Sequence, residues 1–304
     1  MTKNRNKIQG VIPAALTPFD EYGVIDFALF EKHLDYLCSS GIHGLFISGT
    51  TSEGAYITPG ERKELYRTVR KITDGKLPLY VVFLCPHTNQ VIREMQDFME
   101  LEPDYVAAVT PYYYSFTQEE IIAHFTAIAE ASEVPLVLYN IPQNTHNVIE
   151  PASVKFLASH PNIAGIKDSS GAVLPFANYL DGLVGDSGSD FAYIQGEDLL
   201  DAPSLLLGAP AIVTGLGNVW TEPYVAMYDA ARQDDGARVK AEQKRINELA
   251  GIIKAVGGKV LPAIKSAVAS LGRGAPYMRM VSATLKEHER KEIEKILVSL
   301  ELLQ

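Results

Sequence analysis

A lysine, Lys167, ends one of the apolar segments of this chain, in the stretch Ile163-Ala164-Gly165-Ile166-Lys167. Lysine is among the residues least often buried without a partner. If the segment is a buried strand, its apolar surroundings disfavour the charged ammonium, and a neutral amine attacks carbonyl carbons to form Schiff bases. The residues alone leave two alternatives open: an ion pair with the adjacent Asp168, or an ammonium that extends outward to water.

Other candidate groups follow other apolar segments of the chain. Tyr139 lies in Leu136–Asn140, and its phenol can carry a proton to and from a substrate oxygen. Thr50 and Thr51 lie in "SGTTSEG", where the backbone N–H groups of a glycine-rich turn and two hydroxyls can bind a carboxylate without an arginine. The structural alternatives are a core aromatic for Tyr139 and a simple turn for the threonines. Glu53, in the same stretch, is interpreted as structural support.

The elements that must position these groups alternate along the chain up to about residue 232. Strands are predicted at Gly10–Thr17, Gly44–Ser48, Leu79–Leu84, Tyr105–Thr110, Leu136–Asn140, Ala164–Lys167, Ala192–Gln195 and Ala211–Thr214. Helices are predicted at Asp26–Cys38, Pro59–Thr73, Asn89–Leu101, Gln118–Ala131, Pro151–Ser159, Val173–Asp181, Asp198–Leu206 and Thr221–Arg232. Eight parallel strands joined through helices close a (β/α)8 TIM barrel, in which the carboxyl ends of the strands carry the active site. The alternative, a doubly wound open sheet, usually has a glycine-rich loop after the first strand, where "LTPFDEYG" stands instead.

No further strand is predicted after residue 232. Ala237–Ala255, Leu261–Leu271 and Glu287–Leu303 have amphipathic helical patterns. We therefore predict a catalytic barrel over residues 1–232 and a C-terminal helical cap over residues 233–304, which is also a candidate oligomer contact.

Composition excludes several classes of partner. The formal charge of −10, from 27 basic and 37 acidic residues, argues against nucleic-acid or anionic-membrane binding. No stretch approaches the about 18 uninterrupted apolar residues of a membrane span. The two cysteines, Cys38 and Cys85, are predicted to be small buried apolar residues in a cytoplasmic protein. The seven histidines show no metal-ligand spacing, so no metal is expected.

Five ordered motifs resemble the pyruvate-dependent class I (Schiff-base) aldolase superfamily, whose members include dihydrodipicolinate synthase, N-acetylneuraminate lyase and the 2-keto-3-deoxy sugar-acid aldolases. The motifs are "SGTTSEG", "TPYYY", "YNIP", "GIKDSS", and "QGED" followed by "LLLGAPAIVTGLGN". The resemblance covers essentially the whole chain. It implies that Lys167 forms a Schiff base with pyruvate without a metal or other cofactor, and that Tyr139 relays protons. It also implies that Thr50 and Thr51 hold the pyruvate carboxylate and that Thr51 joins the relay.

The resemblance implies two further roles. Tyr113, the second tyrosine after Pro111, matches a tyrosine that reaches into the neighbouring subunit's site, which implies a homo-oligomer, commonly a dimer of dimers. Val213 matches the position whose backbone carbonyl lies near the bound keto acid.

Departures from the family patterns bear on the substrate. The synthase pattern places an arginine where this chain has Asn144, and an amide cannot clamp a carboxylate through two hydrogen bonds. The sialic-acid lyase pattern has Gly-Ser-Thr-Gly-Glu in the first loop and an Asp-Glu pair after the seventh strand, and this chain has neither. A sugar-acid aldolase or dehydratase is therefore favoured. Its polyhydroxy 2-keto acid would meet Gln143, Asn144, His146, Glu197 and Asp198, with His146 either contacting the distal end of the substrate or covering the pocket rim. A keto-acid-binding paralogue without turnover is the remaining alternative.

Overall fold

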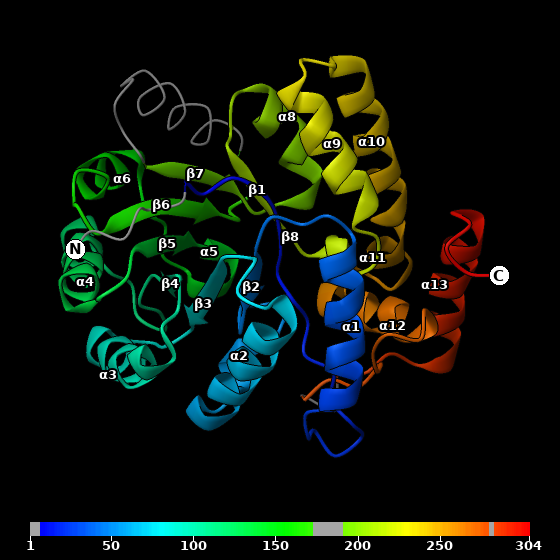
Figure 1. Cartoon of the computed structure of the whole chain (residues 1–304), viewed down its shortest axis with the longest axis horizontal. Coiled ribbons are helices and arrows are strands. Elements are labelled where there is room, and N and C mark those ends of the chain that lie inside the picture. The colour runs from blue at the N-terminus through cyan, green and yellow to red at the C-terminus, as the bar shows by residue number, and fades with distance from the viewer. Residues whose placement is uncertain (1–6, 173–190, 280–282) are drawn as a thin grey trace.

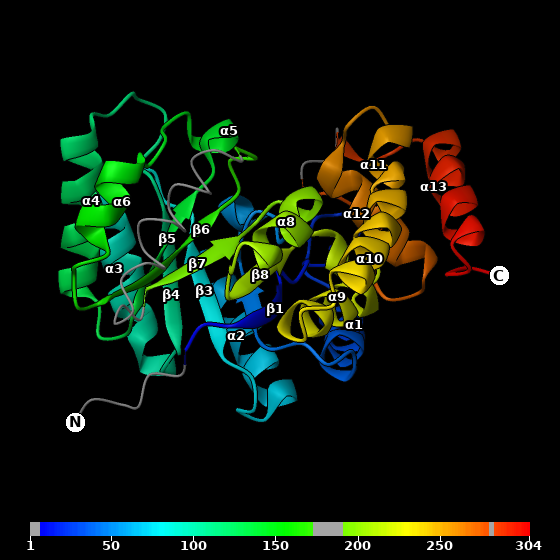
Figure 2. The same cartoon turned by 90° about the horizontal axis from the view of Figure 1, so that it is seen from above.

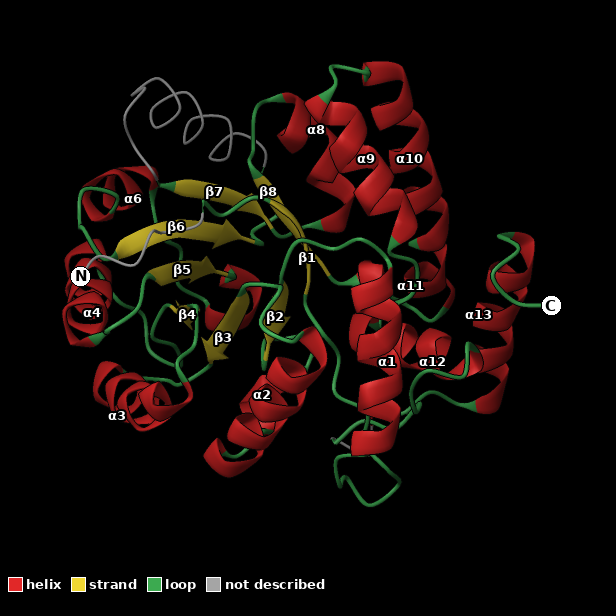
Figure 3. Cartoon of the chain, in the orientation of Figure 1, coloured by secondary structure: helices red, strands yellow, loops and turns green. Residues whose placement is uncertain are grey.

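The computed structural model describes residues 7–172, 191–279 and 283–304. Within these ranges the strands form a single eight-stranded parallel sheet with the order β1-β8-β7-β6-β5-β4-β3-β2 (Figures 1 and 3). The strands are β1 (Gly10–Pro13), β2 (Leu45–Ile47), β3 (Leu79–Phe83), β4 (Tyr105–Val109), β5 (Leu136–Asn140), β6 (Ile163–Asp168), β7 (Ala192–Gln195) and β8 (Ala211–Thr214). The two edge strands meet through a parallel bridge between Ala14 and Phe46, so the sheet curves into a nearly closed barrel. The predicted TIM barrel is confirmed.

Helices surround the sheet, as the ribbon views show (Figure 3). Those of the barrel are α1 (Phe27–Ser39), α2 (Pro59–Thr73), α3 (Thr88–Phe98), α4 (Gln118–Ala131), α5 (Pro142–Thr145), α6 (Pro151–Leu157), α8 (Asp201–Leu206) and α9 (Glu222–Arg232). The C-terminal helices are α10 (Gly236–Leu249), α11 (Gly251–Ala255), α12 (Val260–Ser270) and α13 (Glu287–Ser299). Single 3-10 turns lie at η1 (Gly54–Tyr56), η2 (Met99–Leu101), η3 (Asp198–Leu200) and η4 (Leu216–Asn218). The helix predicted at Val173–Asp181 lies outside the described residues.

Local signals in the sequence account for the sharpest helix boundaries. α2 begins after Thr58, whose hydroxyl accepts from the Glu61 N–H while the Glu61 carboxylate accepts from the Thr58 N–H at 2.9 Å. α4 begins with the same reciprocal arrangement between Thr117 and Glu120. Such capping boxes satisfy two backbone N–H groups that a helix start otherwise leaves open. The capping boxes account for the first residues of both helices, and the predicted bounds of both helices are the observed ones.

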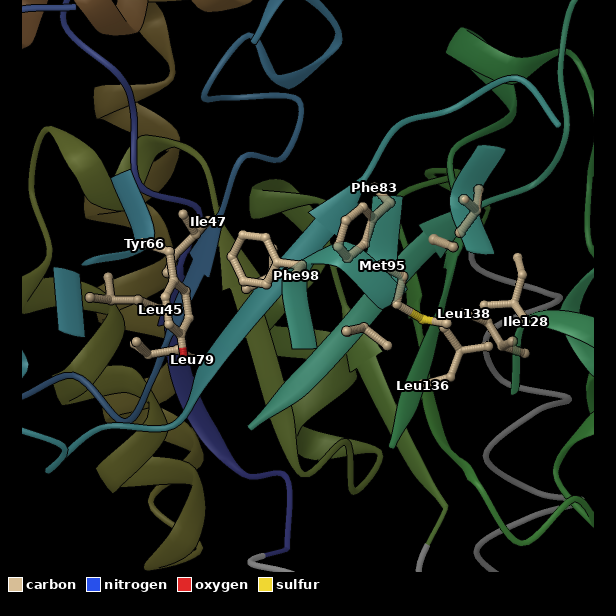
Figure 4. Close-up of a cluster of buried hydrophobic side chains, with 14 of the residues drawn as sticks. Leu45, Ile47, Tyr66, Leu79, Phe83, Met95, Phe98, Ile128, Leu136 and Leu138 are labelled. Atoms are coloured by element: carbon tan, nitrogen blue, oxygen red, sulfur yellow. The ribbon is translucent and has the colours of Figure 1, made fainter. Parts of the chain in front are cut away.

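Two apolar layers follow from the alternation of side chains along each strand. One set points into the barrel, where Phe46, Tyr80, Val137, Tyr139 and Ile194 pack together. The other set faces the helices outside. Figure 4 shows part of this outer layer, in which side chains of β2, β3 and β5 lie near residues of α2, α3 and α4. A residue near the carboxyl end of a strand therefore reaches the barrel interior only if its side chain belongs to the set that points inward.

The C-terminal helices share a core with the last barrel helices. A continuous apolar cluster joins Met227 of α9 to Ile246 of α10, Ile264 of α12 and Ile293 of α13. α13 packs on α11 and α12 and lies farthest from the barrel, as Figures 1 and 2 both show. No helix in the described part of the chain is long and apolar enough to cross a membrane.

Differences from the sequence prediction occur where a periodic pattern is cut short. The first predicted strand ends at Pro13 because at Ala14 the chain turns from its partner β8 toward β2. The helix predicted at Asp198–Leu206 begins as the 3-10 turn η3 and becomes α-helical at Asp201. The four-residue helix α5 was not predicted, because it is too short to show a helical period.

Candidate active site

Lys167 points into the barrel near the carboxyl end of β6. The residue is only 5% exposed, and its amine makes no hydrogen bond or ion pair with a described residue. Its Nζ lies 3.8 Å from the centroid of the Tyr139 ring and 5.6 Å from that of the Phe46 ring. Tyr139 of β5 and Ile194 of β7 are its neighbours in the sheet. The amine is therefore enclosed by aromatic rings and has no counter-ion among these residues.

The carboxylate of Asp168 is bound elsewhere. Its Oδ1 accepts from the side-chain amide of Asn140 at 3.0 Å and from the Ser170 N–H at 2.9 Å. Its Oδ2 accepts from the Tyr193 hydroxyl at 2.8 Å. Alternation along β6 places Asp168 on the face opposite to Lys167. The two alternatives for Lys167, an ion pair with Asp168 and an ammonium extended to water, are therefore wrong.

Gly196 leaves room for the lysine side chain. A methyl group at Gly196 would lie 2.9 Å from Cε of Lys167 and would overlap Oγ of Ser169. Both contacts would be closer than ordinary van der Waals contact, so a residue larger than glycine at this position would displace the lysine side chain. Gly196 was not predicted as a site residue, although its place directly after β7 in "QGED" was an available signal.

The Tyr139 hydroxyl has a partner on the loop after β2. Thr50 Oγ1 lies 3.1 Å from the Tyr139 oxygen, so a proton can pass between the two hydroxyls. The Thr51 hydroxyl instead lies on the side of Gly215, 3.8 Å from where a side chain at Gly215 would begin. The family resemblance implies that Thr51 joins the relay, whereas the hydroxyl that contacts Tyr139 in the structure is that of Thr50.

The loop that carries both threonines is tightly turned. Ser48 and Glu53 have left-handed φ values of 59° and 56°, and a side chain at Gly54 would overlap the Ser48 carbonyl. The N–H groups of Ser52, Glu53 and Gly54 donate to carbonyls of the same loop. Those of Thr50 and Thr51 donate to no group in the described ranges. Two adjacent backbone N–H groups without a partner in these ranges can bind an anion such as a carboxylate.

A buried ion pair fixes the far side of this loop. The Glu53 carboxylate accepts from Nζ of Lys265 in α12 at 2.5 Å and from the backbone N–H of Arg279 at 3.0 Å. Both charged side chains are 1% exposed. Burial lowers the pKa of Lys265 to about 8, which leaves it mostly charged at neutral pH. Glu53 is thus structural, as predicted. Lys265 was not predicted, although a lysine in the apolar run "VLPAIKSAVAS" was a visible signal.

A cavity of about 340 Å³ opens beside Thr50 at the carboxyl ends of β2 to β5. The C-terminal residues Leu261, Met278 and Ala283 cover it. Its lining is Thr50, Glu53, Gly54, Ala55, Tyr56, Leu84, Val109, Tyr112, Ile141, Asn144, Thr145, Leu261, Met278 and Ala283. Of the predicted site residues, only Thr50 and Asn144 line this cavity.

Three more predicted residues lie near the barrel mouth. Val213 is buried in β8, in the same interior cluster as Tyr139. Asp198 has its carboxylate engaged: Oδ1 accepts from the Tyr224 hydroxyl at 2.7 Å, and Oδ2 lies 3.3 Å from the N–H groups of two residues after β8. Burial raises the pKa of Asp198 to about 6. Its neighbour Glu197 is half-buried. Asp198 therefore holds the loop after β8, with little of its carboxylate left for a ligand.

The remaining predicted residues lie at the surface. His146 ends α5 with a left-handed φ of 58° and is exposed. Gln143 donates its amide to the Ser169 carbonyl at 2.6 Å. Tyr113 is 82% exposed and has a φ of 81°, a rare conformation for a bulky residue. The structure thus does not bring Tyr113 to the Lys167 site of its own chain.

The described residues contain no group of three or more His, Cys, Asp or Glu side chains able to hold a metal ion. Cys38 and Cys85 are both free; Cys85 is buried and Cys38 half-buried.

A TIM barrel with an unpaired amine at the end of β6, beside two joined hydroxyls and an anion-binding turn, has the features of a Schiff-base lyase acting on keto acids. The chain belongs to the dihydrodipicolinate synthetase family, whose model matches residues 7–300. It is therefore a class I pyruvate-dependent lyase, and the resemblance seen in the sequence is confirmed.

Individual relatives are distant but match over nearly their full length. The chain is 29% identical to the 4-hydroxy-tetrahydrodipicolinate synthase of Methanoculleus marisnigri, over 96% of this chain and 99% of the relative. It is 31% identical to that of Macrococcus caseolyticus, over 94% of each. The crystal structure of the chloride-inhibited dihydrodipicolinate synthase of Acinetobacter baumannii, complexed with pyruvate, matches with a TM-score of 0.90 and 27% identity, over 97% of this chain and 100% of that one.

Proposed function

We propose that Lys167 forms a Schiff base with pyruvate or another 2-keto acid, and that the chain catalyses reversible aldol cleavage, or dehydration, of a 2-keto-3-deoxy acid. The observation that carries this proposal is the enclosed, unpaired amine of Lys167 next to the hydrogen-bonded Thr50 and Tyr139 hydroxyls. The carboxylate of the keto acid binds the open N–H groups of Thr50 and Thr51.

Each residue then has a defined step. The Lys167 amine attacks C2 of the keto acid, and Tyr139, connected to Thr50, transfers the protons that let the carbonyl oxygen leave as water. The positively charged imine withdraws electrons from C3, which loses a proton to give an enamine. The enamine attacks an aldehyde to form a carbon–carbon bond, and cleavage is the reverse. The chemistry needs no metal or cofactor beyond the covalent imine.

A partner subunit completes the relay in this proposal. Tyr113 is exposed and has a strained backbone conformation, which often marks functional positions. We infer a homo-oligomer, a dimer of dimers, in which Tyr113 reaches the Thr50–Tyr139 pair of a neighbouring chain.

The names of the relatives support a second candidate, the condensation of pyruvate with aspartate semialdehyde. That aldehyde carries a carboxylate, yet the described cavity lining contains no Lys, Arg or His. Asn144 stands there in place of the synthase arginine. We therefore favour a 2-keto-3-deoxy acid, for which the sequence predicts a sugar acid, over the synthase reaction.

Enamine formation can be tested without knowing the aldehyde. Pyruvate is incubated with the protein in deuterated water, and loss of its methyl proton signal is followed by NMR. Exchange catalysed by the wild type and lost in Lys167→Ala supports the proposal. Equal exchange by both proteins refutes the role of Lys167. Turnover of aspartate semialdehyde at a rate comparable with the best 2-keto-3-deoxy acid would favour the synthase instead.

A further inference from the structure

The wall of the cavity beside Thr50 is mostly apolar in the described part of the chain. Leu84 follows β3, Val109 ends β4 and Ile141 follows β5, so the barrel contributes three aliphatic side chains. Leu261 and Met278 close the opposite side. The two sides of the cavity come from segments more than a hundred positions apart, which is why the sequence showed no apolar pocket.

Most polar side chains in the lining have their hydrogen bonds made inside the protein. The Tyr112 hydroxyl donates to the Leu84 carbonyl at 3.0 Å. The Thr145 hydroxyl accepts from Thr110 at 2.8 Å and lies within 3.2 Å of the Ile141 carbonyl. The Glu53 carboxylate accepts hydrogen bonds from Lys265 and from the Arg279 N–H, and the Thr50 hydroxyl is hydrogen-bonded to that of Tyr139.

Asn144 and Tyr56 are the exceptions, since neither the Asn144 amide nor the Tyr56 hydroxyl has a partner among the described residues, and Tyr56 is 49% exposed. Asn144 is exposed, so this amide belongs to the rim of the cavity. A polyhydroxy chain inside would exchange water for a wall with few open partners, and each unmatched hydroxyl weakens binding. An apolar group loses nothing by leaving water.

We propose that the 2-keto acid used by this chain carries an apolar group beyond C4, such as an aryl or branched alkyl group, and that Leu261 helps to select it. This inference rests on the proposed Schiff-base function. It also replaces the polyhydroxy tail expected from the sequence. A volume of about 340 Å³ is ample, since a dry apolar cavity of about 150 Å³ can hold benzene.

The test measures aldol addition of pyruvate to benzaldehyde and to racemic glyceraldehyde. The readout is the ratio of the two kcat/KM values. We expect the ratio to exceed 10 in the wild type and to fall at least tenfold in Leu261→Gln, which adds an amide to the wall. Hydration of glyceraldehyde lowers the concentration of its free aldehyde by the same factor in every assay. The change in the kcat/KM ratio between variants therefore reports on the cavity alone.

Leu77→Gln is the matched control. Leu77 is also half-buried, but it precedes β3 at the opposite end of the barrel. Its substitution should leave the ratio unchanged. Three results would each overturn the proposal of an apolar substrate: a ratio near or below 1 in the wild type, an unchanged ratio in Leu261→Gln, or pyruvate exchange without turnover of either aldehyde. Absence of pyruvate exchange would instead refute the proposed function itself.

Discussion

Replacing Lys265 by methionine isolates the buried ion pair that anchors the anion-binding loop. Methionine keeps the length of the side chain but removes the charge. Glu53 would then hold a buried carboxylate whose remaining described partner is the Arg279 N–H. Removing one member of a buried pair costs about 3–5 kcal/mol, because the other charge is left without compensation. We therefore expect Lys265→Met to lower the free energy of unfolding by about 3–5 kcal/mol.

The assay is equilibrium urea unfolding at pH 7, followed by circular dichroism at one fixed protein concentration, because oligomer formation also contributes to stability. In the double variant Glu53→Gln/Lys265→Met neither of these two positions carries a charge, so part of the lost stability should return. Lys291→Met is the control. It removes an exposed ion pair with Glu287 on α13, and such pairs contribute at most about 1 kcal/mol.

The same substitution has a functional consequence. Glu53 ends the loop whose Thr50 and Thr51 N–H groups are proposed to bind the keto-acid carboxylate, so Lys265→Met should also raise the KM for pyruvate. If Lys265→Met stayed within about 1 kcal/mol of the wild type, the C-terminal helices would not hold the loop in the way described.

Three other substitutions or conditions test separate parts of the structure. Gly196→Ala should lower kcat at least tenfold, because the new methyl group displaces the Lys167 amine, and its overlap with Ser169 should also lower the melting temperature; unchanged kcat would contradict this. Burial lowers the pKa of His33 to about 3 and that of His124 to about 4. The unfolded chain therefore binds protons below about pH 6 that the folded chain does not. As the pH falls from about 6 to about 4, each histidine should therefore reduce the free energy of unfolding by about 1.4 kcal/mol per pH unit. Urea titrations that give the same free energy of unfolding at pH 7, 6 and 5 would refute this. Burial without a hydrogen-bond partner raises the pKa of Asp201 well above its usual value. The folded chain thus holds this proton more tightly than the unfolded chain, and stability is lost as pH rises above about 4. Asp201→Asn should melt higher than the wild type at pH 7 and equally at pH 4, and a lower melting temperature at pH 7 would count against it.

The fold could be predicted because its signals are local and periodic. The first residues of α2 and α4 follow from capping boxes within four residues of sequence. The short helix α5 and the 3-10 start of the segment at Asp198 carry no period, and the surrounding loops determine them. The inward direction of Lys167 also follows from alternation once β6 is located.

The site could be predicted only as far as its residues lie on strands. Thr50 and Thr51 are adjacent in an irregular turn, so the sequence could not decide which hydroxyl meets Tyr139. The engagement of Asp198 by Tyr224, and the covering of the cavity by Leu261, depend on contacts between distant segments. Pattern analysis along one chain does not reveal such contacts.

The most direct test of the central claim is the intact mass of the protein after incubation with pyruvate and borohydride. Borohydride reduces the imine to a stable secondary amine, and peptide mapping locates the adduct. The account predicts one reduced pyruvate adduct per chain, on Lys167, and none in Lys167→Ala. An adduct that persists in Lys167→Ala, or no adduct in the wild type, would contradict it.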